Sequence, residues 1–524
     1  MPVAGALGVS FLVKNYAPEA KGHGVPEVMD AIHYHRGDIR PMVAVVKSVA
    51  SALTIGSGGS VGREGPIIQI GSAFGSTLSQ LLEMRPYERV IMIACGAGGG
   101  IAATFNTPVG GMLFAVELLL HEVSVKTLVP VAVSTVTATY IGQLFFGAHP
   151  SFVIPALETP YFQIANPIVL LTYLGLGVLM GLASTVFIKS IYFFEDLFDL
   201  RIKGGYYARH VLGMTIVGIL IYMSMVLFGH YYVEGVGYAT IQEILSGKGF
   251  PLYLLLVLFL LKLLATSLTL GSGGSGGIFS PALFLGATLG GTYGHFLVRL
   301  FPQLPISPSA FAVAGMAGIV GGATGAAMTS IVMIFEMTLD YSMVLPMTIT
   351  VAISYGLRKL FSGESIYTQK LARRGHRIPD SLRASLIQVK RAGDIMDTRF
   401  VIVPGTLTFA ELSGQVNLED QSLTNILVED GSMITGLLLN EAAALSLSKR
   451  CKGTEAVGES ATKDFLAVTE NTSIMGLISR IFSREISFVL VLAEGTTPTA
   501  KNVRGVITKK RLAEFVSEAI EPFS

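Results

Sequence analysis

The chain has 524 residues, a formal net charge of +1, 51% hydrophobic residues and only 14% charged residues. Soluble globular domains carry about 25% charged residues, so most of this chain cannot face water, and the composition indicates an integral membrane protein. The near-zero charge offers no basic surface for nucleic acid, and we expect no nucleic-acid partner. The two cysteines, Cys95 and Cys451, do not make a disulfide framework.

Several apolar stretches are long enough to span a membrane. Uncharged stretches cover 127–147, 167–188 and 211–229, and each meets the length of about 20 residues that an apolar helix needs to cross a bilayer. Other apolar runs, such as 65–83 and 279–298, contain glycines that predict broken helices. Such breaks indicate a transport pathway, because irregular backbone at membrane depth must be satisfied by protein or by a water-lined cavity. The alternative is that the glycines only allow helices to pack closely.

The first 375 residues contain an internal repeat. The segments 54–66 and 269–281 lie 215 positions apart and share glycine, serine and proline at seven matching positions. Lys47 and Lys262 keep the same offset, and two segments ending at Glu117 and Glu336 correspond at an offset of 219. The repeat predicts two related halves with a substrate site between them. The spacing alone does not tell whether the halves are inverted.

Both copies of the repeated turn, "GSGGSVGREGP" at 56–66 and "GSGGSGGIFSP" at 271–281, end in proline before an apolar run. Proline is favoured in the first turn of a helix, where backbone N–H groups lack partners and the helix dipole is positive. A small anion can be held there by backbone alone. A third turn of this kind, "GHGVPEV" at 22–28, suggests that three helix starts converge on one anion. The spacing excludes a Walker phosphate loop.

Arg63 and Glu64 stand inside the first repeated turn. Charges within a bilayer are costly and usually functional, although the two residues could instead form a structural ion pair. A carboxylate beside helix N-termini can mimic an anion, occupying the site when it is ionised and leaving it when it is protonated or displaced. We therefore expect Glu64 to act as a gate.

After residue 367 the sequence becomes basic, with Lys370, Arg373, Arg374, His376 and Arg377 in close succession. The positive-inside rule places this end, and the tail that follows, in the cytoplasm. From 391 to 524 short strands alternate with amphipathic helices, including a strand, a turn at Asp430-Gly431 and a second strand. We expect a soluble α/β unit of two similar halves.

These motifs together resemble the CLC family of chloride channels and transporters. "GHGVPE" resembles the family's GSGIPE, "GREGP" at 62–66 is unchanged, "GGIFSP" at 276–281 resembles GGIFAP, and "IYTQKLARRG" carries the late tyrosine. The resemblance implies that Glu64 is the extracellular gate and that an anion also meets the following positions: His23, Gly24, Gly62, Arg63, Gly65, Ile278, Phe279 and Tyr367. The amides of Gly62, Arg63 and Gly65 would surround the outer anion. Ile278, Phe279 and the Tyr367 hydroxyl would hold the central one.

Two positions depart from the family pattern. His23 replaces the serine that selects the anion, so the transported ion is in question; the alternative is a turn residue that faces away from the anion. Leu118 replaces the inner glutamate of the coupled transporters, which favours a passive channel of the voltage-gated type or a weakly proton-coupled exchanger. Glu64 and Glu117 stay candidates for a proton path. The family also has one more membrane helix, and half of another, before residue 1, and we expect an incomplete amino end.

The tail resembles a tandem pair of CBS domains, with "AGDIMDTRFVIV" at its start and "RGVITKKRL" at its end. CBS domains that bind adenosine nucleotides usually close with G-x-x-T-x-x-D, whereas this chain has Gly505, Thr508 and then Arg511. We therefore expect no cofactor, no nucleotide and no metal. The predicted domains are a membrane domain at 1–375, a linker at 376–390, and CBS units at 391–455 and 456–524.

The sequence thus predicts an all-α polytopic membrane domain with two related repeats, expected to be inverted, and broken helices, followed by a cytosolic α/β tandem CBS domain. The resemblance implies a chloride-transporting homodimer, not an enzyme, in a bacterial plasma membrane. One alternative is a relative that prefers another anion, such as fluoride or nitrate. Another is a membrane sensor bearing CBS domains that transports nothing.

Overall fold

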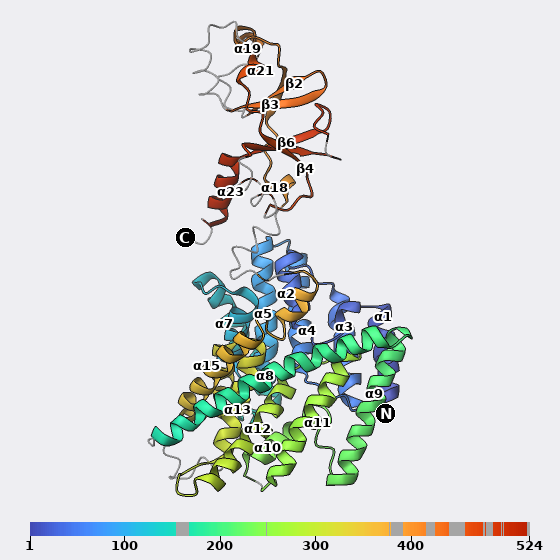
Figure 1. Cartoon of the computed structure of the whole chain (residues 1–524), viewed down its shortest axis with the longest axis vertical. Coiled ribbons are helices and arrows are strands. Elements are labelled where there is room, and N and C mark those ends of the chain that lie inside the picture. Colours follow the sequence, from blue (N-terminus) through green and yellow to red (C-terminus); the bar gives the residue numbers. More distant parts are fainter. Residues whose placement is uncertain are drawn as a thin grey trace. The chain divides into compact units, whose positions relative to one another are not determined.

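The computed structural model describes residues 1–153, 167–247, 249–376, 378, 391–415, 425–439, 456–474, 477, 481, 486–493, 495 and 497–520. The chain forms two compact units, Met1–Asp380 and Ser381–Ser524 (Figure 1). Most of the predicted linker at 376–390, the predicted boundary at residue 455 and Cys451 lie outside the described residues.

The described part of the first unit consists of helices joined by turns, in keeping with the all-α prediction. In chain order they are α1 Pro2–Asn15, η1 Pro18–Ala20, α2 Val25–Tyr34, α3 Pro41–Gly56, α4 Glu64–Leu81, α5 Pro86–Phe105, α6 Pro108–Phe114, η2 Ala115–Leu120, α7 Val125–Phe146, α8 Pro167–Arg201, α9 Gly205–Phe228, α10 Tyr238–Leu245, α11 Leu252–Gly271, α12 Phe279–Leu300, α13 Pro308–Thr324, α14 Ala327–Thr338, η4 Tyr341–Met343, α15 Val344–Phe361 and α16 Thr368–Arg373.

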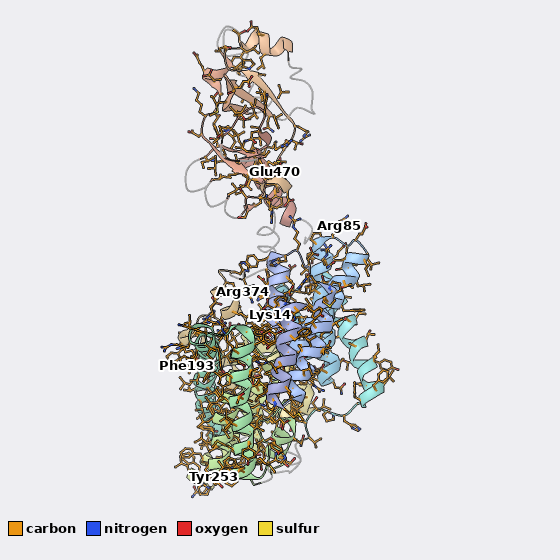
Figure 2. The ribbon with its side chains drawn as sticks, turned by 90° about the vertical axis from the view of Figure 1, so that its right-hand side faces the viewer. Lys14, Arg85, Phe193, Tyr253, Arg374 and Glu470 are labelled. Atoms are coloured by element: carbon orange, nitrogen blue, oxygen red, sulfur yellow. The ribbon has the colours of Figure 1, made fainter. Side chains whose placement is uncertain are left out.

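Within the described residues, five helices are long and apolar enough to cross a membrane: α5, α7, α8, α9 and α11. The three uncharged stretches found in the sequence fall in α7, α8 and α9. Large apolar side chains on this unit face outward, and Phe193 and Tyr253 are 61% and 64% exposed. Figure 2 shows Arg85 and Arg374 toward one end of the helical unit and Tyr253 at the opposite end. This distribution suits a lipid-facing surface between two polar ends.

The glycines inside the two long runs do not break their helices, so that part of the sequence prediction was wrong. Residues 64–81 and 279–300 each form one continuous helix, α4 and α12. A Cβ on Gly71 would lie 2.1 Å from the carbonyl oxygen of Gly96, and a Cβ on Gly286 would lie 2.4 Å from that of Gly315. These glycines therefore bring α4 against α5 and α12 against α13, as the close-packing alternative expects. The helices are interrupted in the turns before Glu64 and Phe279.

The two halves meet through reciprocal contacts at the repeated turns. The N–H of Gly62 donates to the carbonyl of Gly277 at 2.7 Å, and the N–H of Gly277 donates back to the carbonyl of Gly62 at 2.6 Å. Glu117 accepts from the N–H of Thr329 at the start of α14 (2.8 Å), while Glu336 accepts from the N–H of Gly110 at the start of α6 (2.6 Å). Contacts exchanged in this way relate the two halves by an approximate local two-fold.

The second unit contains two small sheets of the same topology. The first sheet comprises β1 Phe400–Pro404, β2 Asn425–Asp430 and β3 Met433–Leu439, and the second comprises β4 Phe465–Thr469, β5 Phe488–Leu492 and β6 Val503–Thr508. In each, the first two strands are parallel and the last two antiparallel. The helices described around them are α18 Ala392–Ile395, α19 Phe409–Gln415, α21 Val457–Ser460 and α23 Lys509–Ile520. The prediction of an α/β unit with two similar halves is confirmed.

Candidate functional site

Three helices of the first unit begin close to one point. Gly24, Arg63 and Ile278 immediately precede α2, α4 and α12. A Cβ on Gly65 would lie only 2.1 Å from the carbonyl oxygen of His23, and a Cβ on Gly277 only 2.6 Å from the nitrogen of Gly65. Glycine is therefore required at these two positions for the three helix starts to meet. The predicted convergence of helix N-termini is present in the fold.

Glu64 lies at the centre of this convergence and is 1% exposed. Its Oε1 accepts hydrogen bonds from the hydroxyls of Tyr238 and Ser280, and its Oε2 accepts from the backbone N–H of Ser280 at 3.3 Å. The carboxylate of the first residue of α4 thus also caps the first turn of α12. It occupies a position where helix dipoles favour negative charge.

The Arg63 side chain lies over an aromatic ring, that of Tyr238. It is exposed, and its guanidinium lies 5.7 Å above the centre of the Tyr238 ring. Within the described residues no ion pair joins Arg63 to Glu64, so the structural-pair alternative has no support. Arg63 contributes to the site mainly through its place at the start of α4.

The role predicted for the Gly62 amide needs correction. That N–H is used in the reciprocal hydrogen bond with the carbonyl of Gly277. It is therefore not available to an anion in this conformation. The amides of Arg63 and Gly65 remain at the start of α4, where N–H groups lack intrahelical partners.

The other predicted anion-binding residues lie beside the same turns and are buried. Ile278 and Phe279 are 2% and 4% exposed at the start of α12, and Tyr367, at the start of α16, is 1% exposed. His23 is 3% exposed, and its ring centre lies 5.7 Å from that of Tyr367. Neither ring nitrogen of His23 has a hydrogen-bond partner within the part of the chain that the structure describes. An imidazole with two unpaired nitrogens and a phenol therefore lie together in the interior of the protein.

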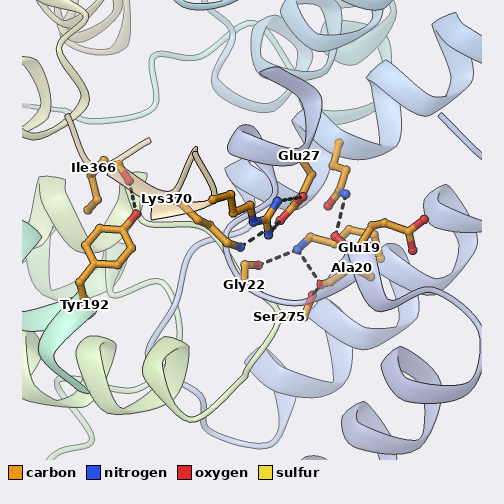
Figure 3. A network of polar contacts seen from close by, with 11 residues as sticks. Glu19, Ala20, Gly22, Glu27, Tyr192, Ser275, Ile366 and Lys370 are labelled. Carbon is orange, nitrogen blue, oxygen red and sulfur yellow. Dashed lines mark hydrogen bonds and ion pairs between the residues drawn. The ribbon is translucent and has the colours of Figure 1, made fainter. Parts of the chain in front are cut away.

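Buried hydrogen bonds hold the loop that carries His23 (Figure 3). Lys47 Nζ donates to the carbonyls of Ala20 at 3.0 Å and Gly22 at 2.7 Å. The hydroxyl of Ser275 donates to the same Ala20 carbonyl at 2.8 Å. Because the lysine comes from α3 and the serine from the second half, both halves of the chain fix the position of this loop.

Tyr367 is positioned by a second set of contacts, also visible in Figure 3. The Tyr192 hydroxyl donates to the carbonyl of Ile366, the residue before Tyr367, at 2.5 Å. Lys370 of α16 and Arg374, the residue that follows α16, form ion pairs with Glu27 of α2 at 3.0 and 2.8 Å. These contacts tie the segment with Tyr367 to the helix that follows His23.

The structure contains a fourth glycine turn that the sequence analysis missed. Gly235 and Gly237 adopt φ angles of 54° and 81°, as Gly22 and Gly24 adopt 79° and 85°. Lys262 Nζ donates to the carbonyls of Val233 and Gly235 at 3.2 and 2.7 Å, as Lys47 does in the first half. The signal was present in the sequence, since "GVGYAT" at 235–240 follows "GHGVPE" at 22–27 by 213 positions.

This fourth turn places Tyr238 at the start of α10, next to Glu64. Tyr238 and Ser280 are the two site residues that sequence reasoning did not select. Ser280 stands in "GGIFSP" where the family motif has alanine, and that difference could have identified it. For Tyr238, the match between the two turns could have located the start of α10, but it does not reveal the contact with Glu64.

Glu117 has a defined structural partner away from the convergence. It accepts from the backbone N–H groups of Met328 at 3.2 Å and Thr329 at 2.8 Å, capping α14. Leu118, beside it, is 6% exposed. The proposed place of Glu117 in a proton path stays a prediction.

In the tail, Arg511 occupies the place of the nucleotide-binding aspartate. Its Nε donates to the carbonyl of Ile395 at 3.3 Å, and its backbone N–H donates to the Thr508 hydroxyl at 3.1 Å. A guanidinium has no acceptor atom, so it cannot accept the hydrogen bonds from ribose hydroxyls that an aspartate would accept. The assignment of the tail to CBS domains, and its lack of a nucleotide, stay predictions.

Comparisons with known proteins agree with the geometry of the first unit. The profile of the family described as "Voltage gated chloride channel" matches residues 5–359. The H(+)/Cl(-) exchange transporter ClcA of Yersinia pestis bv. Antiqua (strain Angola) is 32% identical over 370 residues, which cover 69% of this chain and 75% of that protein. The putative chloride channel protein ClcB-like of Ralstonia nicotianae (strain ATCC BAA-1114 / GMI1000) is 33% identical over 377 residues, covering 71% and 85%.

A solved structure shows the same fold. The crystal structure of a slow cyanobacterial Cl-/H+ antiporter superimposes with a TM-score of 0.63 at 26% identity, over 71% of this chain and 85% of that one. The profile match includes the turns at 22–28, 56–66 and 271–281 that build the convergence. The chain belongs to the voltage gated chloride channel family.

Proposed function

We propose that the protein carries chloride across a membrane, along a path that passes the starts of α2, α4 and α12, and that Glu64 closes this path. The observation that carries the proposal is the buried Glu64 carboxylate, held at the point where the helix starts meet. A carboxylate and a chloride ion compete for the same N–H groups and helix dipoles. The names of the similar proteins, an H(+)/Cl(-) exchange transporter and a putative chloride channel protein, point to the same ion.

The path needs no cationic side chain at the anion itself. The amides of Arg63 and Gly65 at the start of α4 would hold an outer chloride when the Glu64 carboxylate leaves. The starts of α2 and α12, with the His23 ring and the Tyr367 hydroxyl, would hold a more central one. Weak, multiple sites of this kind let an ion enter and also leave.

Proton coupling is proposed to be weak or absent. Leu118 stands where the coupled transporters of the family carry a second, inner glutamate, and it offers no group that can carry a proton. Glu117 is engaged as a cap on α14 through Thr329. The protein would then act as a channel of the voltage-gated type or as a weakly coupled exchanger.

One observation favours a second candidate, selectivity for another anion such as fluoride or nitrate. Within the described residues, both nitrogens of the buried His23 ring lack a partner. This ring would present an N–H to the anion where the family motif has a serine hydroxyl. An imidazole donor differs from a hydroxyl in reach and in rigidity. The preference among anions is then set by a group that the family motif does not have.

Orientation and assembly complete the proposal. Lys370 and Arg373 of α16, and Arg374 directly after it, precede the tail, and the positive-inside rule assigns this end to the cytoplasm. The tail would lie in the cytoplasm of a bacterial cell whose plasma membrane holds the first unit. Two copies would associate, each with its own path.

The test uses full-length protein in liposomes, with chloride flux and proton flux recorded in the same vesicles. Glu64→Ala is expected to leave chloride flowing and to remove the pH and voltage dependence of that flux, because the variant vacates an anion site without removing its N–H groups. Glu83→Ala removes an exposed glutamate and serves as the matched control.

The outcomes separate the alternatives. Gating that is unchanged in Glu64→Ala would refute the gate. Robust proton pumping by a chloride gradient, at a fixed ratio, would contradict weak coupling. Chloride flux slower than both fluoride and nitrate flux would favour the second candidate, and no anion flux from folded protein would leave a membrane sensor as the explanation.

A further inference from the structure

Two hydroxyl groups converge on one oxygen of the gate carboxylate. The hydroxyls of Tyr238 and Ser280 both donate to Glu64 Oε1, and the two hydroxyl oxygens are 2.8 Å apart. The three side chains come from three separate helices, since Tyr238 begins α10, Ser280 lies in the first turn of α12 and Glu64 begins α4. The carboxylate is therefore held by side chains in addition to backbone.

The position of the Tyr238 hydroxyl is set by packing. Its ring lies edge-on to two phenylalanine rings. The distance between ring centres is 5.8 Å for Phe152 and 6.4 Å for Phe105. The residue before it, Gly237, has a φ of 81°, and a Cβ there would lie 2.7 Å from the Phe284 ring. Only glycine allows this turn, and the turn directs Tyr238 toward Glu64.

We infer that Tyr238 and Ser280 form a hydroxyl clasp that holds the ionised Glu64 carboxylate in the path and determines how readily a proton or a chloride ion releases it. The inference rests on the proposed function of Glu64 as a gate. Hydrogen bonds donated to a charged carboxylate are stronger than those between neutral groups, and they favour the ionised form. Tyr238 and Ser280 are positioning residues, because they act on chloride through Glu64.

Other charged or titratable groups also face the gate, and they stay in place when the clasp is removed. Arg63 precedes Glu64 and lies over Tyr238. Lys262 of α11 and Tyr367 both interact electrostatically with Glu64. Because none of them is altered in the variants below, a change in pH dependence reports on the two hydroxyls.

The test compares Tyr238→Phe and Ser280→Ala with the wild type, as full-length protein in liposomes, by chloride flux over a range of pH. Each variant is expected to raise the pH of half-maximal flux by about one unit, which is the tenfold effect of one charge-assisted hydrogen bond. Ser280→Thr keeps a hydroxyl and is expected to restore the wild-type midpoint. Tyr293→Phe, which removes a tyrosine hydroxyl that donates to the Thr172 carbonyl at 3.0 Å, is the matched control.

A second measurement does not depend on transport. Titration calorimetry of detergent-solubilised protein should show chloride bound about tenfold more tightly by Tyr238→Phe, since the carboxylate competes less well for the site. In a Glu64→Gln background, which lacks the titrating carboxyl, Tyr238→Phe is expected to leave the flux independent of pH and the chloride affinity unchanged.

The results distinguish this inference from the proposed function. If the wild type shows Glu64-dependent flux but neither clasp variant shifts the midpoint or the chloride affinity, the clasp is refuted and the gate stands. If the wild type shows no flux, the proposed function fails, and the calorimetric comparison still decides whether the hydroxyls act on Glu64. If Tyr238→Phe does not fold, the comparison of Ser280→Ala with Ser280→Thr decides the matter.

Discussion

Gly65→Ala is the most direct test of the convergence of helix starts. A Cβ at this position would lie 2.1 Å from the carbonyl oxygen of His23 and 3.0 Å from the Cα of Gly277. Non-bonded heavy atoms prefer separations of about 3.5 Å, so the turns at His23 and Gly65 would have to move apart by about 1 Å or more. Both neighbours are backbone atoms, which cannot rotate out of the way as a flexible side chain would.

The size of the effect follows from this displacement. A shift of about 1 Å breaks a hydrogen bond, and one backbone N–H bond to an anion contributes about 2 kcal/mol, or about 30-fold in chloride affinity. Overpacking of the turn should also lower the free energy of unfolding by about 1–3 kcal/mol. Gly65→Ala is therefore expected to bind chloride much more weakly while it loses only part of its stability.

The assay is chloride titration calorimetry together with thermal unfolding in detergent. Gly56→Ala is the matched control, because a Cβ on Gly56 meets no atom within 4 Å. Wild-type chloride affinity in Gly65→Ala would refute the reasoning, since it would mean that the three turns do not need this close approach. An equal loss in Gly56→Ala would point to a general effect of replacing glycine.

Two further predictions concern stability. Lys47→Met should lower the free energy of unfolding by about 2 kcal/mol, because the buried carbonyls of Ala20 and Gly22 each lose one charge-assisted hydrogen bond and keep a second donor, Ser275 or Gly276. Thermal unfolding measures this, and a comparable loss in the exposed Lys359→Met control would contradict the assignment. In the tail, the backbone N–H and then the hydroxyl of Thr408 donate to Glu411 and lower the pKa of its carboxyl below 4.5. In the wild type, α19 should therefore be more stable than in Glu411→Gln. This difference should be complete above the ordinary pKa of a glutamate carboxyl, and it should disappear as the pH falls through the lowered pKa of Glu411. Hydrogen exchange of residues 409–415 in the full chain checks this, and a difference that grows with acidity would refute it.

The sequence was sufficient for features that depend on short-range chemistry. Low charge and long apolar stretches indicated membrane helices, and the glycine-rich turns followed by proline located the starts of α4 and α12. The repeat indicated two related halves before any contact between them was known. These predictions succeeded because composition, turn geometry and helix capping depend on residues that are neighbours along the chain.

The tertiary structure decided the features that depend on contacts between distant segments. It showed that Tyr238, 174 positions after Glu64, donates to the gate carboxylate. It also showed that the Gly62 amide is used by the opposite half, and that the glycines within α4 and α12 pack helices without breaking them. A donor or an acceptor pairs with whichever polar group the fold brings within about 3 Å. When that group belongs to the other half of the chain, spacing along the sequence does not reveal it.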